Sequence, residues 1–209
     1  MCAFISIHQV FMSVLTITLL FIGERPIFLR EYANRKYGVW TYFWSKTVTE
    51  IPFQILFPAL FAISIYFGTG MTADFDRFVI FVLIVVSTVL FAASLGFCVG
   101  CVFEDGTQAS DSAVLIIMPA FMFAGYFVNL KDVYVWLRWI TYLSPIRFSL
   151  EALLRNEFED NDRYINGQQY YKNLDYDVGL TASILILLGW ALFFRIAAAF
   201  ALRFTISKV

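Results

Sequence analysis

Long apolar runs separated by short polar stretches dominate the chain. Five of these runs are long enough to cross a bilayer as helices, which takes roughly 17 to 25 mostly apolar residues. The runs are continuous and lack the alternation of polar and apolar positions that membrane barrels show. The pattern therefore predicts an all-α integral membrane protein with five transmembrane helices. The expected spans are residues 2–22, 39–67, 78–103, 112–128 and 180–202.

The composition supports this class of protein. Of the 209 residues, 60% are hydrophobic and 15% are charged, whereas an ordinary soluble domain has about 25% charged residues. The net charge of −1 gives no reason to expect a nucleic-acid partner. The first apolar run lacks a basic flank and an evident cleavage site, so we expect a retained span, with a signal peptide as the alternative. The chain starts almost inside this span, which suggests a fragment of a longer protein.

The second predicted span contains two prolines and an ion pair. Pro52 and Pro58 are tolerated in a membrane helix when neighbouring groups satisfy the freed carbonyls. Lys46 and Glu50 are four residues apart, so they share one face of the helix. We expect a structural ion pair at the end of the span; membership of a longer polar relay is the alternative.

Small residues repeat every four positions in the third predicted span, at Ala92, Gly96 and Gly100. This spacing predicts a stripe along which another helix can approach closely. Cys98 and Cys101 in the same run have CxxC spacing, but their apolar surroundings favour packing over redox chemistry or metal binding.

Three polar connections join the spans. Residues 24–38 are both charged and apolar, residues 104–111 form a short polar turn, and residues 129–177 form a long segment rich in Tyr and Trp. Within the last segment, Ser144 and Pro145 divide a stretch that we expect to be two short helices, either dipping into the membrane or lying on its interface. Basic residues near the span ends favour the 24–38 side as cytoplasmic.

Enzyme motifs are missing from the sequence. No Gly is followed by Lys, so no Walker A phosphate loop is present, and neither HExxH nor GxSxG occurs. His8 is the only histidine, and a lone polar side chain in a span is more typical of packing or of a pore surface than of acid–base catalysis. We expect no enzyme activity and no cofactor or metal in this chain.

Three blocks of sequence, in order, resemble the G subfamily of ABC transporters, the White-type group of half-transporters. They are ERPIFLREYANRKYGVWTYFWSKTVTEIPFQ, SLGFCVGCVFEDGTQAS and FAGYFVNLKDVYVWLRWITYLSPIRFSLEALLRNEF. The resemblance implies that residues 1–209 form one partial membrane domain, with the five spans being helices two to six of six. Residues 24–38 would be the cytoplasmic coupling segment, in the form of an interfacial helix, and residues 129–177 the extracellular re-entrant segment.

The resemblance also implies partners. Members of this family bind ATP and Mg in a nucleotide-binding domain, which this chain lacks, and dimerise as homo- or heterodimers. A hydrophobic small molecule, such as a lipid or a sterol, would pass between the two copies in a plasma or intracellular membrane.

Family roles can be placed on individual residues of this sequence. The substrate pocket would be lined by His8, Phe11, Val114, Met118 and Phe121, with Tyr126 and Phe127 as a hydrophobic plug. His8 departs from the family pattern, in which some members have Asn. The alternative for all seven is ordinary helix packing.

Contact with the ATPase domain would involve the 24–38 segment. We expect Phe28 to enter the membrane interface with its apolar neighbours, and the charged side chains to face water or the partner. The alternative is a basic anchor for lipid headgroups. The charged residues are Glu24, Arg25, Arg30 and Glu31.

The function predicted from the sequence is the transmembrane part of an ATP-driven exporter of lipids, sterols or other hydrophobic compounds. The alternative is a truncated, non-transporting scaffold or regulator that pairs with an intact half-transporter. An intramembrane enzyme is disfavoured, because the spans contain no paired catalytic groups.

Overall fold

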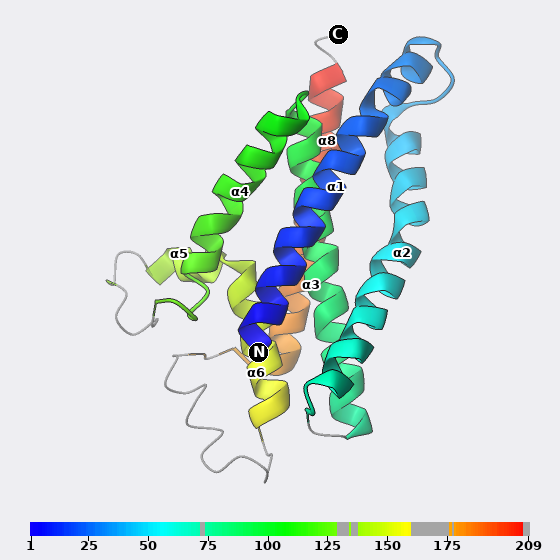
Figure 1. Ribbon diagram of the computed structural model, residues 1–209. Helices are drawn as coiled ribbons and strands as arrows, with labels where there is room; N and C mark the ends of the chain where they lie inside the picture. Colours follow the sequence, from blue (N-terminus) through cyan, green and yellow to red (C-terminus); the bar gives the residue numbers. More distant parts are fainter. Residues whose placement is uncertain (72–73, 129–133, 135–137, 160–175, 177, 207–209) are drawn as a thin grey trace.

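The protein is a bundle of helices (Figure 1). The computed structural model describes residues 1–71, 74–128, 134, 138–159, 176 and 178–206. All regular secondary structure in these ranges is helical, so the all-α prediction is confirmed. The helices are α1 (Cys2–Ala33), α2 (Val39–Gly68), α3 (Phe75–Val102), α4 (Gly106–Met122), α5 (Arg138–Leu143), α6 (Pro145–Phe158) and α8 (Leu180–Ile206).

Four of these helices, α1, α2, α3 and α8, are long and apolar enough to cross a membrane. The fourth predicted span is wrong in its boundaries. We expected residues 112–128, but α4 begins at Gly106 and ends at Met122. The polar residues expected in a turn therefore form the first turns of the helix. With 17 residues, α4 is at the lower limit for crossing a bilayer.

Helix α1 is longer than its apolar run. It continues without a break through Pro26 to Ala33, so most of the 24–38 segment is the last part of α1 and not a separate interfacial helix. Charged residues in the last turns do not stop a helix, since Glu and Arg are good helix formers. The chain then turns through Asn34–Gly38, where Arg35 has a φ of 53°, and returns as α2.

Helix α3 occupies the centre of the bundle and packs against α1, α2, α4, α6 and α8. Its residues Phe91–Phe97 are all buried. The predicted stripe of small residues lies against α1: a Cβ added to Gly96 would be 2.8 Å from the backbone oxygen of Val14, and one added to Gly100 would be 3.1 Å from the ring of Phe21. Across this contact the Thr18 hydroxyl donates a hydrogen bond to the carbonyl of Gly96, at 3.1 Å.

The segment expected to be two short helices is indeed divided at Ser144, between α5 and α6. Helix α6 does not lie on an interface; twelve of its fourteen residues are buried. Several of its polar side chains form hydrogen bonds within the bundle. The Ser149 hydroxyl is 2.7 Å from that of Thr88 on α3 and donates to Ser6 on α1 at 3.1 Å. This part of the 129–177 segment is therefore packed inside the bundle; residues 129–133, 135–137, 160–175 and 177 are outside the described residues.

The contact of α3 with α1 predicts the effect of adding a methyl group to a glycine. Gly96→Ala should destabilise the protein by about 1–3 kcal/mol, because the new Cβ would overlap the α1 backbone. Gly189→Ala is the control, since Gly189 lies within α8 with nothing within 4 Å of an added Cβ. It should be neutral or slightly stabilising. Thermal unfolding in detergent, followed by tryptophan fluorescence, measures both, and equal midpoints for the two variants would contradict the close contact.

Candidate functional site

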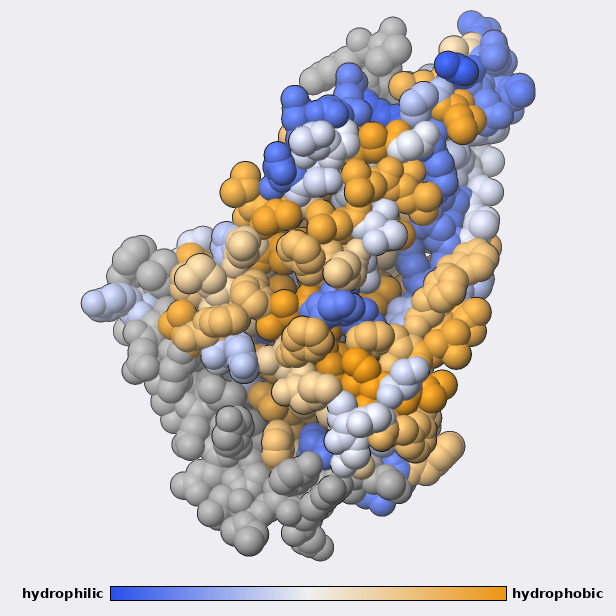
Figure 2. All heavy atoms as spheres, in the orientation of Figure 1, coloured by the Kyte–Doolittle hydropathy of each residue, from blue (hydrophilic) through white to orange (hydrophobic). Residues whose placement is uncertain are grey.

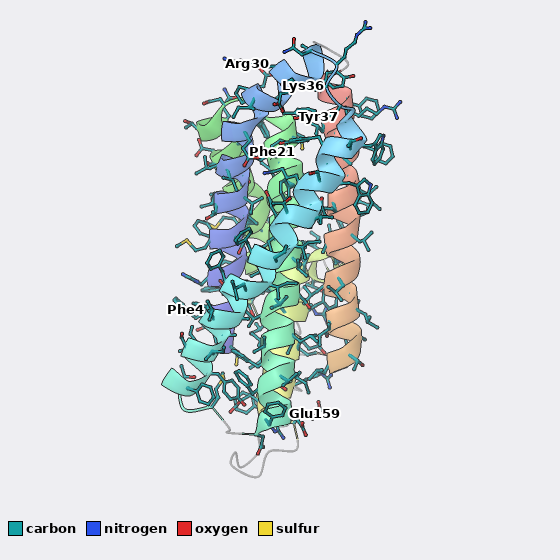
Figure 3. The ribbon with its side chains drawn as sticks, turned by 90° about the vertical axis from the view of Figure 1, so that its right-hand side faces the viewer. Phe4, Phe21, Arg30, Lys36, Tyr37 and Glu159 are labelled. Carbon is teal, nitrogen blue, oxygen red and sulfur yellow. The ribbon has the colours of Figure 1, made fainter. Side chains whose placement is uncertain are left out.

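One end of the bundle is charged and the surface below it is apolar. Figure 3 shows Arg30, Lys36 and Tyr37 together at this end, whereas Phe4 and Glu159 lie toward the other. In Figure 2 the polar surface at the top of the view covers the end of α1 and gives way to a broad hydrophobic belt. This distribution is that of helices whose middle parts are surrounded by lipid.

The sequence predicted that Arg25 faces water or a partner, but in the structure its side chain is buried. Its side chain is only 5% exposed. The guanidinium donates to the carbonyl of Phe103, at 2.8 Å, and to Oε1 of Glu104, at 3.0 Å. Arg25 thus joins the end of α1 to the α3–α4 connection, because the last carbonyls of α3 have no donors within that helix.

Phe28 is also placed differently from the sequence prediction. It is 1% exposed and lies in the protein interior, not in the membrane interface. Its ring stacks on the ring of Tyr42 of α2, with 4.1 Å between the two ring centroids. The ring of Tyr37 also lies near it. Tyr37 donates a hydrogen bond to Glu31, and this bond raises the pKa of the Tyr37 phenol to about 12. Arg30 is exposed, as predicted.

The Lys46–Glu50 pair expected from the sequence is present, with Nζ 2.7 Å from Oε1. Lys46 also binds Glu24 of α1. Glu50 in turn accepts a hydrogen bond from Nε2 of Gln54, at 3.2 Å. The side chains of Lys46 and Glu50 are only 11% and 13% exposed. Since a single buried charge would be costly, the charges are held as a connected group.

A fourth charged residue, Arg195 of α8, completes this group and was not identified from the sequence. It interacts electrostatically with Glu50, and its guanidinium lies 4.7 Å from the ring centre of Phe97. Together, Glu24, Lys46, Glu50 and Arg195 carry no net charge. The sequence signal available for Arg195 was a single Arg within an apolar run, since intramembrane charges usually have partners.

The two predicted pocket residues on α1 have different surroundings. The imidazole of His8 is stacked between Phe4 and Phe61, with 5.7 Å between centroids on each side. Phe11 is half-buried and packs against a hydrophobic cluster to which α1, α3, α4, α6 and α8 contribute. Both surroundings are also compatible with simple packing, which was the alternative.

The predicted residues on α4 lie along its half-buried and exposed sides. Val114 is half-buried, Met118 is 53% exposed, and the ring of Phe121 is 4.7 Å from that of Phe127. Tyr126 and Phe127 are also in contact, at 5.0 Å. The structure thus brings Phe121 and the two plug residues into one aromatic cluster.

The fold and the charge group define a class: a membrane domain whose spanning helices carry an internal neutral charge group and a charged end. Residues 1–158 match the family model of the ABC-2 type transporter. The chain belongs to this family. The match agrees with the family resemblance noted above.

Curated relatives agree with the family assignment. The chain is 33% identical to Protein white of Ceratitis capitata over 148 residues, which cover 71% of this chain and 22% of that protein. It is 30% identical to ABC transporter G family member 22 of Arabidopsis thaliana, over 90% of this chain and 24% of the relative. It is also 30% identical to the broad substrate specificity ATP-binding cassette transporter ABCG2 of Bos taurus, over 89% and 27%. The matched region is thus about a quarter of the length of these relatives.

The charge group predicts that two lysines respond differently to loss of their charge. Lys46→Met should destabilise the protein by about 3–5 kcal/mol, because it removes the ion pairs that Lys46 makes with Glu24 and with the largely buried Glu50. Lys36→Met is the control: Lys36 is 61% exposed and lies 3.9 Å from Glu31, so its loss should cost less than about 1 kcal/mol. Thermal unfolding in detergent measures both, and equal losses would contradict the buried group.

Proposed function

We propose that this chain is the transmembrane part of an ATP-driven exporter for lipids, sterols or other hydrophobic compounds. The observation that carries the proposal is the match of residues 1–158 to the ABC-2 type transporter family. The buried charges of Lys46 and Glu50 support an uncharged cargo, because they are already paired with each other, and Lys46 also with Glu24. A charged cargo would need a counter-charge that they do not offer.

The working unit would be a dimer of membrane domains, formed with a second copy or with a related half-transporter. Helix α4 supports this arrangement through its exposed apolar side chains: Leu115 is 72% exposed, and Met118 and Met122 are 53% and 52% exposed. These side chains, together with Phe11, would face the cargo path between the two domains. The aromatic cluster of Phe121, Tyr126 and Phe127 would close that path on one side.

Energy would come from a nucleotide-binding domain that holds ATP and Mg. Its contact would be the charged end of α1, where Ile27 is 59% exposed beside the exposed Arg30. Arg25 would transmit movement there, since its guanidinium joins the end of α1 to the α3–α4 connection. A rigid link of this kind moves two segments together.

The pocket assignment is tested by cargo-stimulated ATP turnover of the full-length parent protein in lipid vesicles. Phe11→Ala should reduce stimulation by a lipid-like cargo roughly tenfold while leaving basal turnover unchanged, because the variant removes an apolar contact worth about 1–3 kcal/mol. Phe75→Ala is the control, as Phe75 is 77% exposed at the start of α3. An unchanged cargo response in Phe11→Ala would count against the pocket. Absence of any ATP-dependent transport in the parent protein would favour the non-transporting scaffold.

Coupling is tested by a pair of changes at the charged end of α1. Arg30→Ala with Glu31→Ala should leave membrane insertion unchanged and reduce transport per ATP hydrolysed at least several-fold, because both side chains would contact the ATPase domain. Tyr37→Phe is the control, since it removes the same hydrogen bond to Glu31 and retains the surface charges. Normal transport per ATP in the double variant would show that the segment is only a lipid anchor.

A further inference from the structure

A groove of about 500 Å³ separates α1 from α2. Both helices pack on α3, and the buried Val89 and Ala93 of α3 lie at its base. Exposed apolar side chains, among them Met12, Phe53 and Phe57, form its walls. The volume is within the range of roughly 300–1,000 Å³ that ligand pockets have. Because these walls belong to membrane-spanning helices, the groove lies at the depth of the bilayer.

The groove lies on a different side of α1 from Phe11. Its α1 residues include Gln9, Ser13, Thr16 and Leu20, which recur at steps of three or four and therefore share one face. Phe11 is two residues from both Gln9 and Ser13, a rotation of about 200° around the helix. A ligand in this groove would therefore be separate from cargo in the proposed pocket.

Two oxygen atoms of Gln54, one in the side chain and one in the backbone, can each accept a further hydrogen bond. The Gln54 side chain is 6% exposed and lines the groove. Its amide nitrogen donates to Glu50, whereas its Oε1 accepts no hydrogen bond from the described part of the chain. In addition, residue 58 is a proline, which has no N–H, so the backbone carbonyl of Gln54 lacks its usual helical donor. Pro58 lines the same groove.

Buried acceptors without a donor cost free energy, and a ligand that supplies a donor recovers it. The donor must be uncharged, because Glu50 and Lys46, one and two turns toward the charged end, already compensate each other. The rest of the ligand must be apolar to match Phe57 and Met12. A carboxylate or phosphate would bring acceptors in place of the missing donor.

We propose that this groove is a binding site for an uncharged membrane lipid that carries a hydroxyl donor. The hydroxyl donates to Gln54, and the apolar body lies along α1 and α2 between Met12 and Phe57. Gln54 is four residues, or about 6 Å along the helix, from Glu50. The hydroxyl is thus one turn below the charge group, and the body extends deeper into the bilayer.

The test uses photoreactive cholesterol with a free 3-hydroxyl and the corresponding 3-methyl ether, added to the protein in phosphatidylcholine nanodiscs without ATP. The alcohol should label peptides of α1 and α2, and the ether should need a roughly five- to tenfold higher concentration, since it cannot donate a hydrogen bond. This comparison requires no variant. Equal labelling by both probes, or no labelling of α1 and α2, would overturn the proposal; the latter would show that another helix fills the groove.

A variant provides the second arm. Gln54→Leu should weaken labelling by the alcohol to the level of the ether, while Ser64→Ala, an exposed position on the same helix, should not. A photoreactive diacylglycerol, which also has one hydroxyl, tests whether the donor or the sterol ring is recognised. Phe11→Ala should leave labelling unchanged, so failure of this site and failure of the proposed cargo pocket can be distinguished.

Discussion

The close approach of α1 to α3 at Gly96 is the contact on which the rest of the bundle depends. The carbonyl of Val14 lies where a side chain would otherwise be, and Thr18 donates across the contact. Lipid tails are as apolar as the helices, so burial of apolar surface from water cannot hold the helices together within the bilayer. Close packing and hydrogen bonds between helices therefore hold the bundle together. With α1 fixed on α3 in this way, the end of α1 is directed toward the α3–α4 connection, where Arg25 binds the carbonyl of Phe103.

The charge group follows from the same geometry. Helices α1, α2 and α8 all pack on α3, which brings Glu24, Lys46, Glu50 and Arg195 together around Phe97. Each of these charges alone would be costly at this depth. Their sum is zero, and the ring of Phe97 receives the guanidinium of Arg195 at 4.7 Å. The group therefore connects three helices, so a shift of one helix changes the surroundings of charges on the others. This property is suited to a domain that has to change conformation as a unit.

Much of this architecture could be predicted from the sequence. Continuous apolar runs identified the spanning helices, and the spacing of Lys46 and Glu50 predicted their ion pair. The errors have physical causes. Hydropathy locates the apolar part of a helix but not its ends, so the extension of α1 to Ala33 and the start of α4 at Gly106 were missed. The burial of Arg25 depends on the carbonyl of Phe103, 78 residues later, and no local pattern contains such a partner. The cargo pocket and the coupling role stay predictions that rest on resemblance.

The two sides of α1 carry different kinds of residue, and this difference separates their roles. The side with Phe11 offers an aromatic ring and packs against a hydrophobic cluster that includes residues of α4. Contacts of this kind do not require a particular orientation of a bound molecule. The side with Gln9 and Ser13 faces α2, where Gln54 and Pro58 leave acceptors that one donor can satisfy. A hydrogen bond of this kind fixes both depth and orientation. The surface with Phe11 suits a cargo that passes through, and the surface with Gln9 and Ser13 suits a lipid that stays bound. A lipid bound in the groove would also fill the space between α1 and α2, and would thereby resist their closure against each other.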